Sequence, residues 1–192
     1  MTTPLDSTKA SLRDQIRARL QKLSAAERAA ASTSLCARLR EQPVWSAARF
    51  VLLFALLPDE PDLWPILNEA IAAGKSVALP AFAPGTNGYL ARQIIDPVRD
   101  LVAGRFGIRE PLPACPEVLL NRLDLVLVPG IAFDVRGGRL GRGRGFYDRL
   151  LAGVRGPKCG VAFEEQIVEA VPVGPLDIRL NCILTPTRWI ET

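Results

Sequence analysis

The sequence predicts an α/β fold in three layers, in which helices flank a mainly parallel, twisted sheet and a helical hairpin stands at the N-terminus. Two observations favour this fold. From residue 50 onward, short apolar runs typical of buried strands alternate with segments of helical character, and that order indicates parallel strands joined by helices. The first 41 residues show only helical patterns. The length of 192 residues and 48% hydrophobic content fit a single domain over residues 1–192.

Two helices are expected before the first strand. Between Lys9 and Leu23, apolar residues recur at a helical spacing and predict the first helix. Ser24 and Glu27 match a capping box, which predicts a second helix over about residues 25–41.

The first helix has a basic face. Lys9, Arg13 and Arg17 follow one another at a spacing of four, and like charges at that spacing repel each other. They are therefore mildly destabilising unless an anionic group lies against them; for this helix alone, a solvated face is the alternative.

The remaining elements alternate along the chain. Asp62 is a plausible cap for a helix that reaches Ala73 and ends at Gly74, and a loop or short helix is expected after residue 95. A short helix is predicted over residues 147–153. Strands are predicted over residues 50–57, 76–80, 89–95, 125–128, 158–162 and 182–185. Ligands of such sheets bind at the carboxyl ends of the strands.

A segment rich in glycine and arginine, residues 137–149, lies between a predicted strand and a predicted helix. Free backbone N–H groups and the helix dipole at such a place favour an anion, and Arg139, Arg142 and Arg144 add charge that can fork onto phosphate oxygens. Asp148 is either a Mg²⁺ ligand beside a nucleotide or a simple ion-pair partner. A flexible RNA-binding tail is the alternative, but this segment is short, internal and flanked by apolar runs.

The distribution of charge singles out two basic segments. Residues 9–40 and 136–149 are strongly positive, whereas the rest of the chain is net acidic. They could meet around one anionic ligand or be separate solvated faces. The chain has no histidine, which excludes a Ser-His-Asp triad, a Cys-His pair and histidine metal sites.

Other features indicate a cytoplasmic protein. The four cysteines, which lie far apart in the sequence, are expected to be core thiols. The longest apolar run, residues 50–57, is too short to span a bilayer, and the N-terminus shows no secretion signal.

The central segment also carries a family resemblance. Residues 130–134 followed by the glycine–arginine segment resemble the signature of the 5-formyltetrahydrofolate cyclo-ligases, also called methenyltetrahydrofolate synthetases. The resemblance extends over nearly the whole chain. Further blocks similar to those of the family are Lys9 with Leu12 and Arg13, and residues 54–60, 106–111, 161–166 and 171–177.

The resemblance implies an ATP- and Mg²⁺-dependent cyclisation of 5-formyltetrahydrofolate to 5,10-methenyltetrahydrofolate, with release of ADP and phosphate. In that reaction the γ-phosphoryl group activates the formyl oxygen, and N10 of the substrate then attacks the activated carbon. The chemistry needs mainly positioning and charge neutralisation, so it suits a chain without histidine. ATP is the co-substrate, Mg²⁺ the metal and a folate the small-molecule partner; no membrane or nucleic-acid partner is expected, and the protein is expected to be a monomer.

The resemblance also implies roles for individual residues. Catalysis is expected from Arg142, Arg144 and Tyr147. The ATP-binding residues are expected to be Lys9, Arg13, Arg139, Gly141, Arg142, Gly143, Arg144, Gly145, Phe146 and Tyr147. Substrate binding is expected from Phe54, Ala55, Glu60 and Phe106, and metal binding from Asp148 and Asp177. Taken without the resemblance, Asp177 could cap a turn, Glu60 could be a surface acid and Phe106 could be core.

The chain departs from the family pattern near its C-terminus. Leu176, Asn181 and Pro186 stand where the family often has histidine, aspartate and glutamate, which alters the C-terminal metal side. Two alternatives to the cyclo-ligase reaction follow. One is a nucleotide- or RNA-binding module that has lost the folate reaction, and the other is an ATP-dependent ligase for another small formyl or carboxyl compound.

Overall fold

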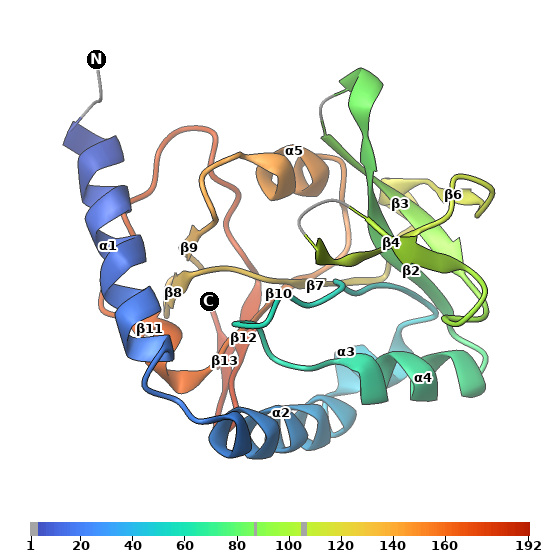
Figure 1. The fold of residues 1–192 in the computed structure, drawn as a ribbon, viewed down its shortest axis with the longest axis horizontal. Coiled ribbons are helices and arrows are strands. Elements are labelled where there is room, and N and C mark those ends of the chain that lie inside the picture. The colour runs from blue at the N-terminus through green and yellow to red at the C-terminus, as the bar shows by residue number, and fades with distance from the viewer. Residues whose placement is uncertain (1–3, 87, 105–106) are drawn as a thin grey trace.

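The structure is a computed structural model that describes residues 4–86, 88–104 and 107–192 (Figure 1). Within these residues, an eight-stranded sheet has the order β13-β12-β10-β7-β1-β2-β3-β6. The strands β12, β10, β7, β1 and β2 are parallel, and the antiparallel strands β13, β3 and β6 lie at its two sides. The predicted mainly parallel sheet is therefore confirmed. No helix in the described part of the chain is long and apolar enough to cross a membrane.

The elements have the following bounds. The helices are α1 (Pro4–Leu20), α2 (Ala25–Arg40), α3 (Pro43–Ala47), α4 (Trp64–Ala72) and α5 (Phe146–Ala152), with short 3-10 turns η1 (Pro84–Thr86), η3 (Leu120–Arg122) and η4 (Glu164–Gln166). The large sheet contains β1 (Phe50–Leu52), β2 (Ser76–Ala83), β3 (Gly88–Ile94), β6 (Glu117–Val118), β7 (Leu125–Val128), β10 (Lys158–Val161), β12 (Cys182–Leu184) and β13 (Trp189–Glu191). Two smaller sheets pair β4 (Leu101–Ala103) with β5 (Arg109–Pro111), and β8 (Ala132–Asp134) with β9 (Arg139–Leu140) and β11 (Ile167–Val168).

Three layers arise because successive strand residues point to opposite faces. Val51 and Leu125 belong to the core that α2, α3 and α4 cover, whereas Leu52 and Val126 belong to the core on the other face, which α5 covers. Both faces of the central strands are apolar, as expected for a parallel sheet buried on both sides.

The two N-terminal helices are present but diverge (Figure 1). Ile16 and Leu20 of α1 pack with residues of β8 and β9 and with Phe163, which precedes η4. In contrast, Leu35 and Leu39 of α2 pack against the large sheet. The predicted hairpin is therefore two consecutive helices in different parts of the core. The capping box of α2 is confirmed, since Glu27 N–H donates to Ser24 Oγ and the Glu27 carboxylate accepts from Ser24 N–H.

Several predicted bounds were wrong. The first helix begins and ends earlier than residues 9–23, and the strand predicted over residues 50–57 ends at Leu52. The last ladder bond at that strand runs from Leu53 N–H to Ala78 O, after which the chain turns and Glu60 N–H donates to Leu57 O. The loop or short helix expected after residue 95 instead contains β4, which pairs with β5.

The order of strands places a topological switch point between β1 and β7. From β1 the chain proceeds to β2 on one side, while β7, β10 and β12 extend the sheet on the other. Loops that follow two such strands diverge and leave room for a ligand at the carboxyl edge. The loop at residues 57–60 follows β1. The glycine–arginine segment comes after β7, begins in the turn between β8 and β9, and ends in α5. The fold thus brings both predicted site segments to the same edge.

Candidate functional site

The glycine loop, residues 141–145, connects β9 to α5. Gly143 and Gly145 have φ of 100° and 63°, a left-handed region that residues with a Cβ rarely adopt. Gly145 is the N-cap residue of α5. The chain can therefore turn sharply into the helix, and the predicted placement of these glycines before a short helix is confirmed.

The basic face of α1 lies against this loop. Arg13 Nε donates to Gly141 O at 2.9 Å, and a Cβ built on Gly143 would be 3.5 Å from Arg13 Cζ. One helical turn away, Lys9 Nζ pairs with Asp177 Oδ2 at 2.5 Å. The two basic segments therefore meet in the fold, as one of the two interpretations of the charge distribution proposed.

Asp177 is an ion-pair partner and also closes a local turn. Its Oδ2 accepts from Gly174 N–H at 2.6 Å. Burial raises the pKa of Asp177, but the hydrogen bonds from Lys9 and Gly174 and the positive charges of Lys9 and Arg139 outweigh it, so the pKa lies below its ordinary value. Asp177 is therefore ionised at neutral pH.

Arg139 is the most deeply buried cation of the site, with a side chain that is 3% exposed. Its Nη2 pairs with Asp148 Oδ1 at 2.8 Å, its Nη1 donates to Pro129 O at 3.3 Å, and its guanidinium lies 5.7 Å from the centre of the Tyr147 ring. Its Nε is buried and has no hydrogen-bond partner among the described residues. A buried donor without an acceptor costs free energy, so this atom favours an additional oxygen ligand at the loop.

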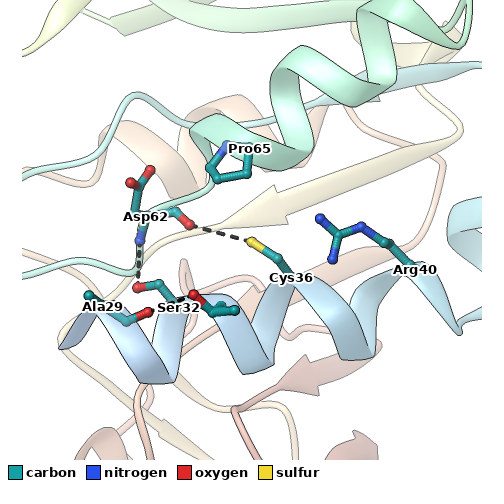
Figure 2. Close-up of a pocket in the computed structure, with 7 residues that line it drawn as sticks. Ala29, Ser32, Cys36, Arg40, Asp62 and Pro65 are labelled. Atoms are coloured by element: carbon teal, nitrogen blue, oxygen red, sulfur yellow. Dashed lines mark hydrogen bonds between the residues drawn. The ribbon is translucent and has the colours of Figure 1, made fainter. Parts of the chain in front are cut away.

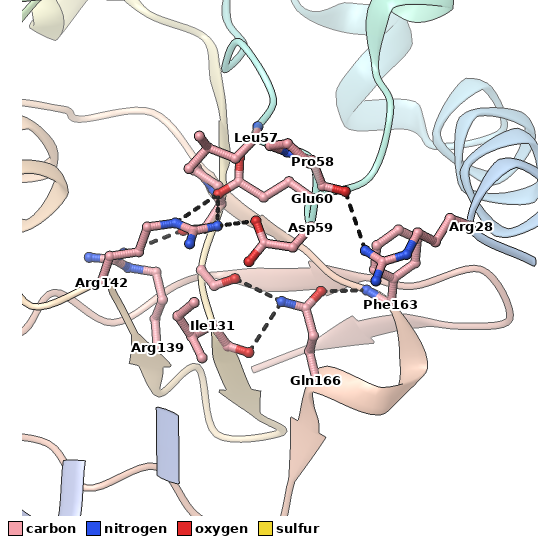
Figure 3. A network of polar contacts seen from close by, with 12 residues as sticks. Arg28, Leu57, Pro58, Asp59, Glu60, Ile131, Arg139, Arg142, Phe163 and Gln166 are labelled. Carbon is pink, nitrogen blue, oxygen red and sulfur yellow. Dashed lines mark hydrogen bonds and ion pairs between the residues drawn. The ribbon is translucent and has the colours of Figure 1, made fainter. Parts of the chain in front are cut away.

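Arg142 connects the glycine loop to the loop after β1 (Figure 3). Its Nη2 lies 2.6 Å from Asp59 Oδ1 and 3.0 Å from Glu60 Oε1, and its Nε donates to Glu60 Oε1 at 3.3 Å. The other carboxylate oxygen of Glu60 accepts from Leu57 N–H at 2.9 Å. A residue assigned to the phosphate side and a residue assigned to the folate side are thus in direct contact.

Arg142, Asp59 and Glu60 form a partly buried cluster of charged side chains. Glu60 is 8% exposed, so it is not the surface acid of the alternative interpretation. Burial raises the pKa of Glu60, and the charge of Arg142 offsets only part of that effect. Burial also lowers the pKa of Arg142, but Asp59 and Glu60 outweigh it and raise that pKa above its ordinary value. Arg142 remains charged and holds two carboxylates together.

Aromatic side chains cover the start of α5. The Phe146 ring lies 5.2 Å from that of Tyr89 and 5.7 Å from that of Phe82, and the Tyr147 ring lies 5.9 Å from that of Tyr89, all edge to face. Burial raises the pKa of Tyr147 well above its ordinary value. The phenol therefore stays protonated and can donate a hydrogen bond but cannot act as a base near neutral pH.

The remaining predicted residues lie in different surroundings. Phe54 and Ala55 are buried in the core beneath α2, α3 and α4, so their part in substrate binding stays a prediction. Phe106 lies outside the described residues. Arg144 is exposed on the glycine loop.

The two predicted metal ligands are each paired with a cation, Asp148 with Arg139 and Asp177 with Lys9. The described residues contain no group of three or more acidic or cysteine side chains that could hold a metal alone. Mg²⁺ commonly binds one or two carboxylates together with phosphate oxygens and water. These two carboxylates alone do not complete a Mg²⁺ coordination shell, so a Mg²⁺ ion bound there would also need phosphate or water oxygens.

Sequence reasoning missed several residues that shape the site. Asp59 was not among the predicted site residues, although its carboxylate lies next to Glu60 in the sequence. Gln166 is 1% exposed, and its Nε2 donates to Gly130 O at 2.7 Å and to Ile131 O at 3.2 Å, just before β8. Its contacts join segments far apart in the sequence, so no local pattern could have revealed them.

The substituted C-terminal residues do not all lie at the site. Asn181 Oδ1 accepts from Lys158 N–H at 2.9 Å, at the amino ends of β10 and β12. Pro186 lies beyond the carboxyl end of β12, where its carbonyl accepts from Arg38. Only Leu176, which is 83% exposed, adjoins a predicted metal ligand. Asn181 therefore lies at the opposite end of these strands from the carboxyl edge.

Two hollows lie away from the glycine loop. One, of about 200 Å³, lies between α2 and the start of α4 and is lined by Ser32, Cys36 and Asp62 (Figure 2). Burial raises the pKa of the Cys36 thiol to about 11, so this thiol is protonated and unreactive at neutral pH. The other, of about 520 Å³, lies beside β6 and the C-terminal end of α5.

Comparisons with known proteins agree on one family. The model of the 5-formyltetrahydrofolate cyclo-ligase family matches residues 6–186. The 5-formyltetrahydrofolate cyclo-ligase of Escherichia coli K12 is 35% identical over 180 residues, which cover 92% of this chain and 99% of that protein. That of Mycolicibacterium smegmatis is 33% identical over 149 residues, covering 75% of this chain and 77% of that protein. The solved structure of Aquifex aeolicus 5,10-methenyltetrahydrofolate synthetase is 33% identical, with a TM-score of 0.86 over 95% of this chain and 92% of that chain.

Proposed function

This chain belongs to the 5-formyltetrahydrofolate cyclo-ligase family, and we propose that it converts 5-formyltetrahydrofolate to 5,10-methenyltetrahydrofolate with ATP and Mg²⁺, releasing ADP and phosphate. We propose further that residues 1–192 form one domain with this activity. The observation that carries the proposal is the contact between Arg142 of the glycine loop and Glu60 of the loop after β1. This contact holds the glycine loop, which we propose binds phosphate, beside the buried carboxylate of Glu60. ATP and a folate bound side by side could therefore contact both.

The nucleotide phosphates are assigned to the edge formed by α1 and the glycine loop. Lys9 and Arg13 approach this edge from α1, while Arg139 and Arg144 belong to the segment that ends at α5. The buried Nε of Arg139, which has no acceptor among the described residues, supports an oxygen-rich ligand there. Mg²⁺, held by Asp148 and Asp177, would neutralise phosphate charge.

The folate is assigned to the loop after β1. A buried carboxylate such as Glu60 can accept hydrogen bonds from ring N–H groups, and its raised pKa reflects the cost of burying the charge, which Arg142 and Leu57 N–H offset only in part. The N–H donors of a bound folate would replace some of the hydrogen bonds that Arg142 now donates to the Glu60 carboxylate. Phe82, Tyr89 and Phe146 form a cluster of rings at the start of α5, which we propose as apolar surface for the folate rings.

The chemical step requires positioned cations more than a base. The formyl oxygen of the folate takes up the γ-phosphoryl group and ADP leaves. N10 then attacks the activated carbon and loses its proton, and the carbon–oxygen bond breaks with departure of phosphate. Arg142 and Arg144 would stabilise the negative charge of the phosphoryl group in transfer, and the protonated Tyr147 would donate a hydrogen bond. Arg142 is suited to this because it already connects the two halves of the site.

The proposal is tested by the near-ultraviolet absorbance of methenyltetrahydrofolate. Purified protein is mixed with 5-formyltetrahydrofolate and Mg²⁺, with and without ATP. We expect a rise in absorbance that requires ATP and stops when Mg²⁺ is chelated. No rise, with ATP still bound, would contradict the proposal and favour a repurposed relative.

A further inference from the structure

Arg28 of α2 contacts three backbone carbonyls that belong to three different segments. Its Nη2 donates to Leu20 O at 2.5 Å, its Nε to Leu23 O at 3.3 Å and its Nη1 to Pro58 O at 3.3 Å. The contact with Pro58 is visible in Figure 3. The three acceptors lie at the end of α1, in the turn before α2 and in the loop after β1.

These segments carry the two halves of the proposed site. Leu20 is the last residue of α1, the helix that places Arg13 against the glycine loop and Lys9 against Asp177. Pro58 immediately precedes Asp59 and Glu60, which hold Arg142. Arg28 therefore joins the helix of the nucleotide side to the loop of the folate side.

The shape of the guanidinium matters as well as its charge. A cation at the C-terminus of α1 is favourable for the exposed carbonyls and the dipole of that helix, and a lysine would supply that charge too. Only the planar fork of an arginine presents donors in several fixed directions, which three carbonyls on separate segments require. The substitution Arg28→Lys therefore separates the effect of the charge from the effect of the donor geometry.

We propose that Arg28 is a positioning residue that fixes the loop at residues 57–60 relative to α1 and thereby sets the spacing between the bound nucleotide and the folate. The inference rests on the proposed function for its kinetic consequence. Reacting groups displaced by about 1 Å can lose on the order of 100-fold in rate. Loss of Arg28 should therefore lower turnover more than it weakens the binding of either substrate.

The structural part is tested without substrates, by amide hydrogen exchange of the free protein. In the loop, Glu60 N–H donates to Leu57 O and Leu57 N–H donates to the Glu60 carboxylate. We expect Arg28→Ala to speed exchange at these two amides about tenfold, in line with the loss of a hydrogen bond from a charged donor. Arg38→Ala is the matched control, because Arg38 also lies half-buried on α2 and donates to a loop carbonyl, that of Pro186.

The kinetic part compares Arg28→Ala, Arg28→Lys and Arg38→Ala. We expect kcat to fall about 10- to 100-fold in both Arg28 variants, with KM for ATP and folate changed by less than about threefold, and to stay near the wild-type value in Arg38→Ala. Full activity in Arg28→Lys would overturn the positioning role, as would loop exchange in Arg28→Ala equal to that of the control. Absence of turnover in the wild type would refute the proposed function, while the exchange measurement would still decide the role of Arg28 in holding the loop. If Arg28→Ala does not fold, Arg28→Lys provides both measurements.

Discussion

Asp134 provides a sharp test of how the structure supports the glycine–arginine segment. Its side chain is buried and accepts three backbone N–H groups, from Arg136 at 2.9 Å, Gly138 at 3.0 Å and Val171 at 2.7 Å. The first two lie in the turn that leads to Arg139, and the third lies in the segment that leads to Asp177. One carboxylate thus joins the two stretches that bring these residues to the site.

The cost of removing this carboxylate follows from the donors that it leaves behind. Of the three N–H groups, those of Gly138 and Val171 make buried hydrogen bonds to Asp134. At about 1–2 kcal/mol for each buried donor left without an acceptor, Asp134→Ala should lower the free energy of unfolding by roughly 2–4 kcal/mol. Asp134→Asn can keep the two bonds to Oδ1 but places a second donor against Val171 N–H, so about half of that loss is expected.

Urea denaturation at neutral pH, followed by circular dichroism, measures both variants against the wild type. The expected order of stability is wild type, then Asp134→Asn, then Asp134→Ala. A loss below about 1 kcal/mol in Asp134→Ala would refute this estimate, because two buried N–H groups left without acceptors should cost more than that.

Four further predictions concern other residues. Burial raises the pKa of Glu164, but hydrogen bonds from Thr185, Thr187 and Arg188 outweigh it and lower that pKa from 4.5 to about 2; the resulting stability is present above pH 4.5 and is lost as the pH falls toward 2. In urea denaturation, Glu164→Gln should therefore cost about 1–2 kcal/mol at pH 7 and progressively less below pH 4.5, and a cost independent of pH would contradict this. Gly145→Ala should lower the free energy of unfolding by about 1–2 kcal/mol because φ is 63° there, and an unchanged unfolding midpoint would show that the strain is absent. Arg144→Ala should reduce turnover about 100-fold while the protein stays folded, and a normal rate in this variant would remove Arg144 from the proposed mechanism. Asp148→Asn should raise the Mg²⁺ concentration needed for half-maximal turnover, and an unchanged Mg²⁺ dependence would remove Asp148 from it.

Local patterns in the sequence were sufficient for much of the fold. The strand over residues 125–128 has the predicted bounds, and the capping box at Ser24 begins α2 as expected. The glycines before α5 could be placed because a left-handed turn into a helix needs residues without a Cβ. These features depend on neighbouring residues, and their physical causes are therefore visible in the sequence.

Contacts between distant segments could not be predicted in the same way. No pattern near Glu60 indicated that it would pair with Arg142, 82 positions later. The small sheet of β8, β9 and β11 was missed because its strands are two or three residues long, too short for a periodic signal. The position of Asn181 at the amino ends of β10 and β12 depends on how these strands pair, which only the assembled sheet determines.

The central claim is that this site transfers the γ-phosphoryl group of ATP to the formyl oxygen of the folate. The most direct measurement uses 5-formyltetrahydrofolate labelled with ¹⁸O in the formyl group, followed by mass spectrometry of the phosphate released during one turnover with Mg²⁺ and ATP. The account predicts one labelled oxygen in each phosphate formed, because the carbon–oxygen bond breaks after the oxygen has been phosphorylated. Phosphate without the label, alongside normal formation of the methenyl product, would contradict it.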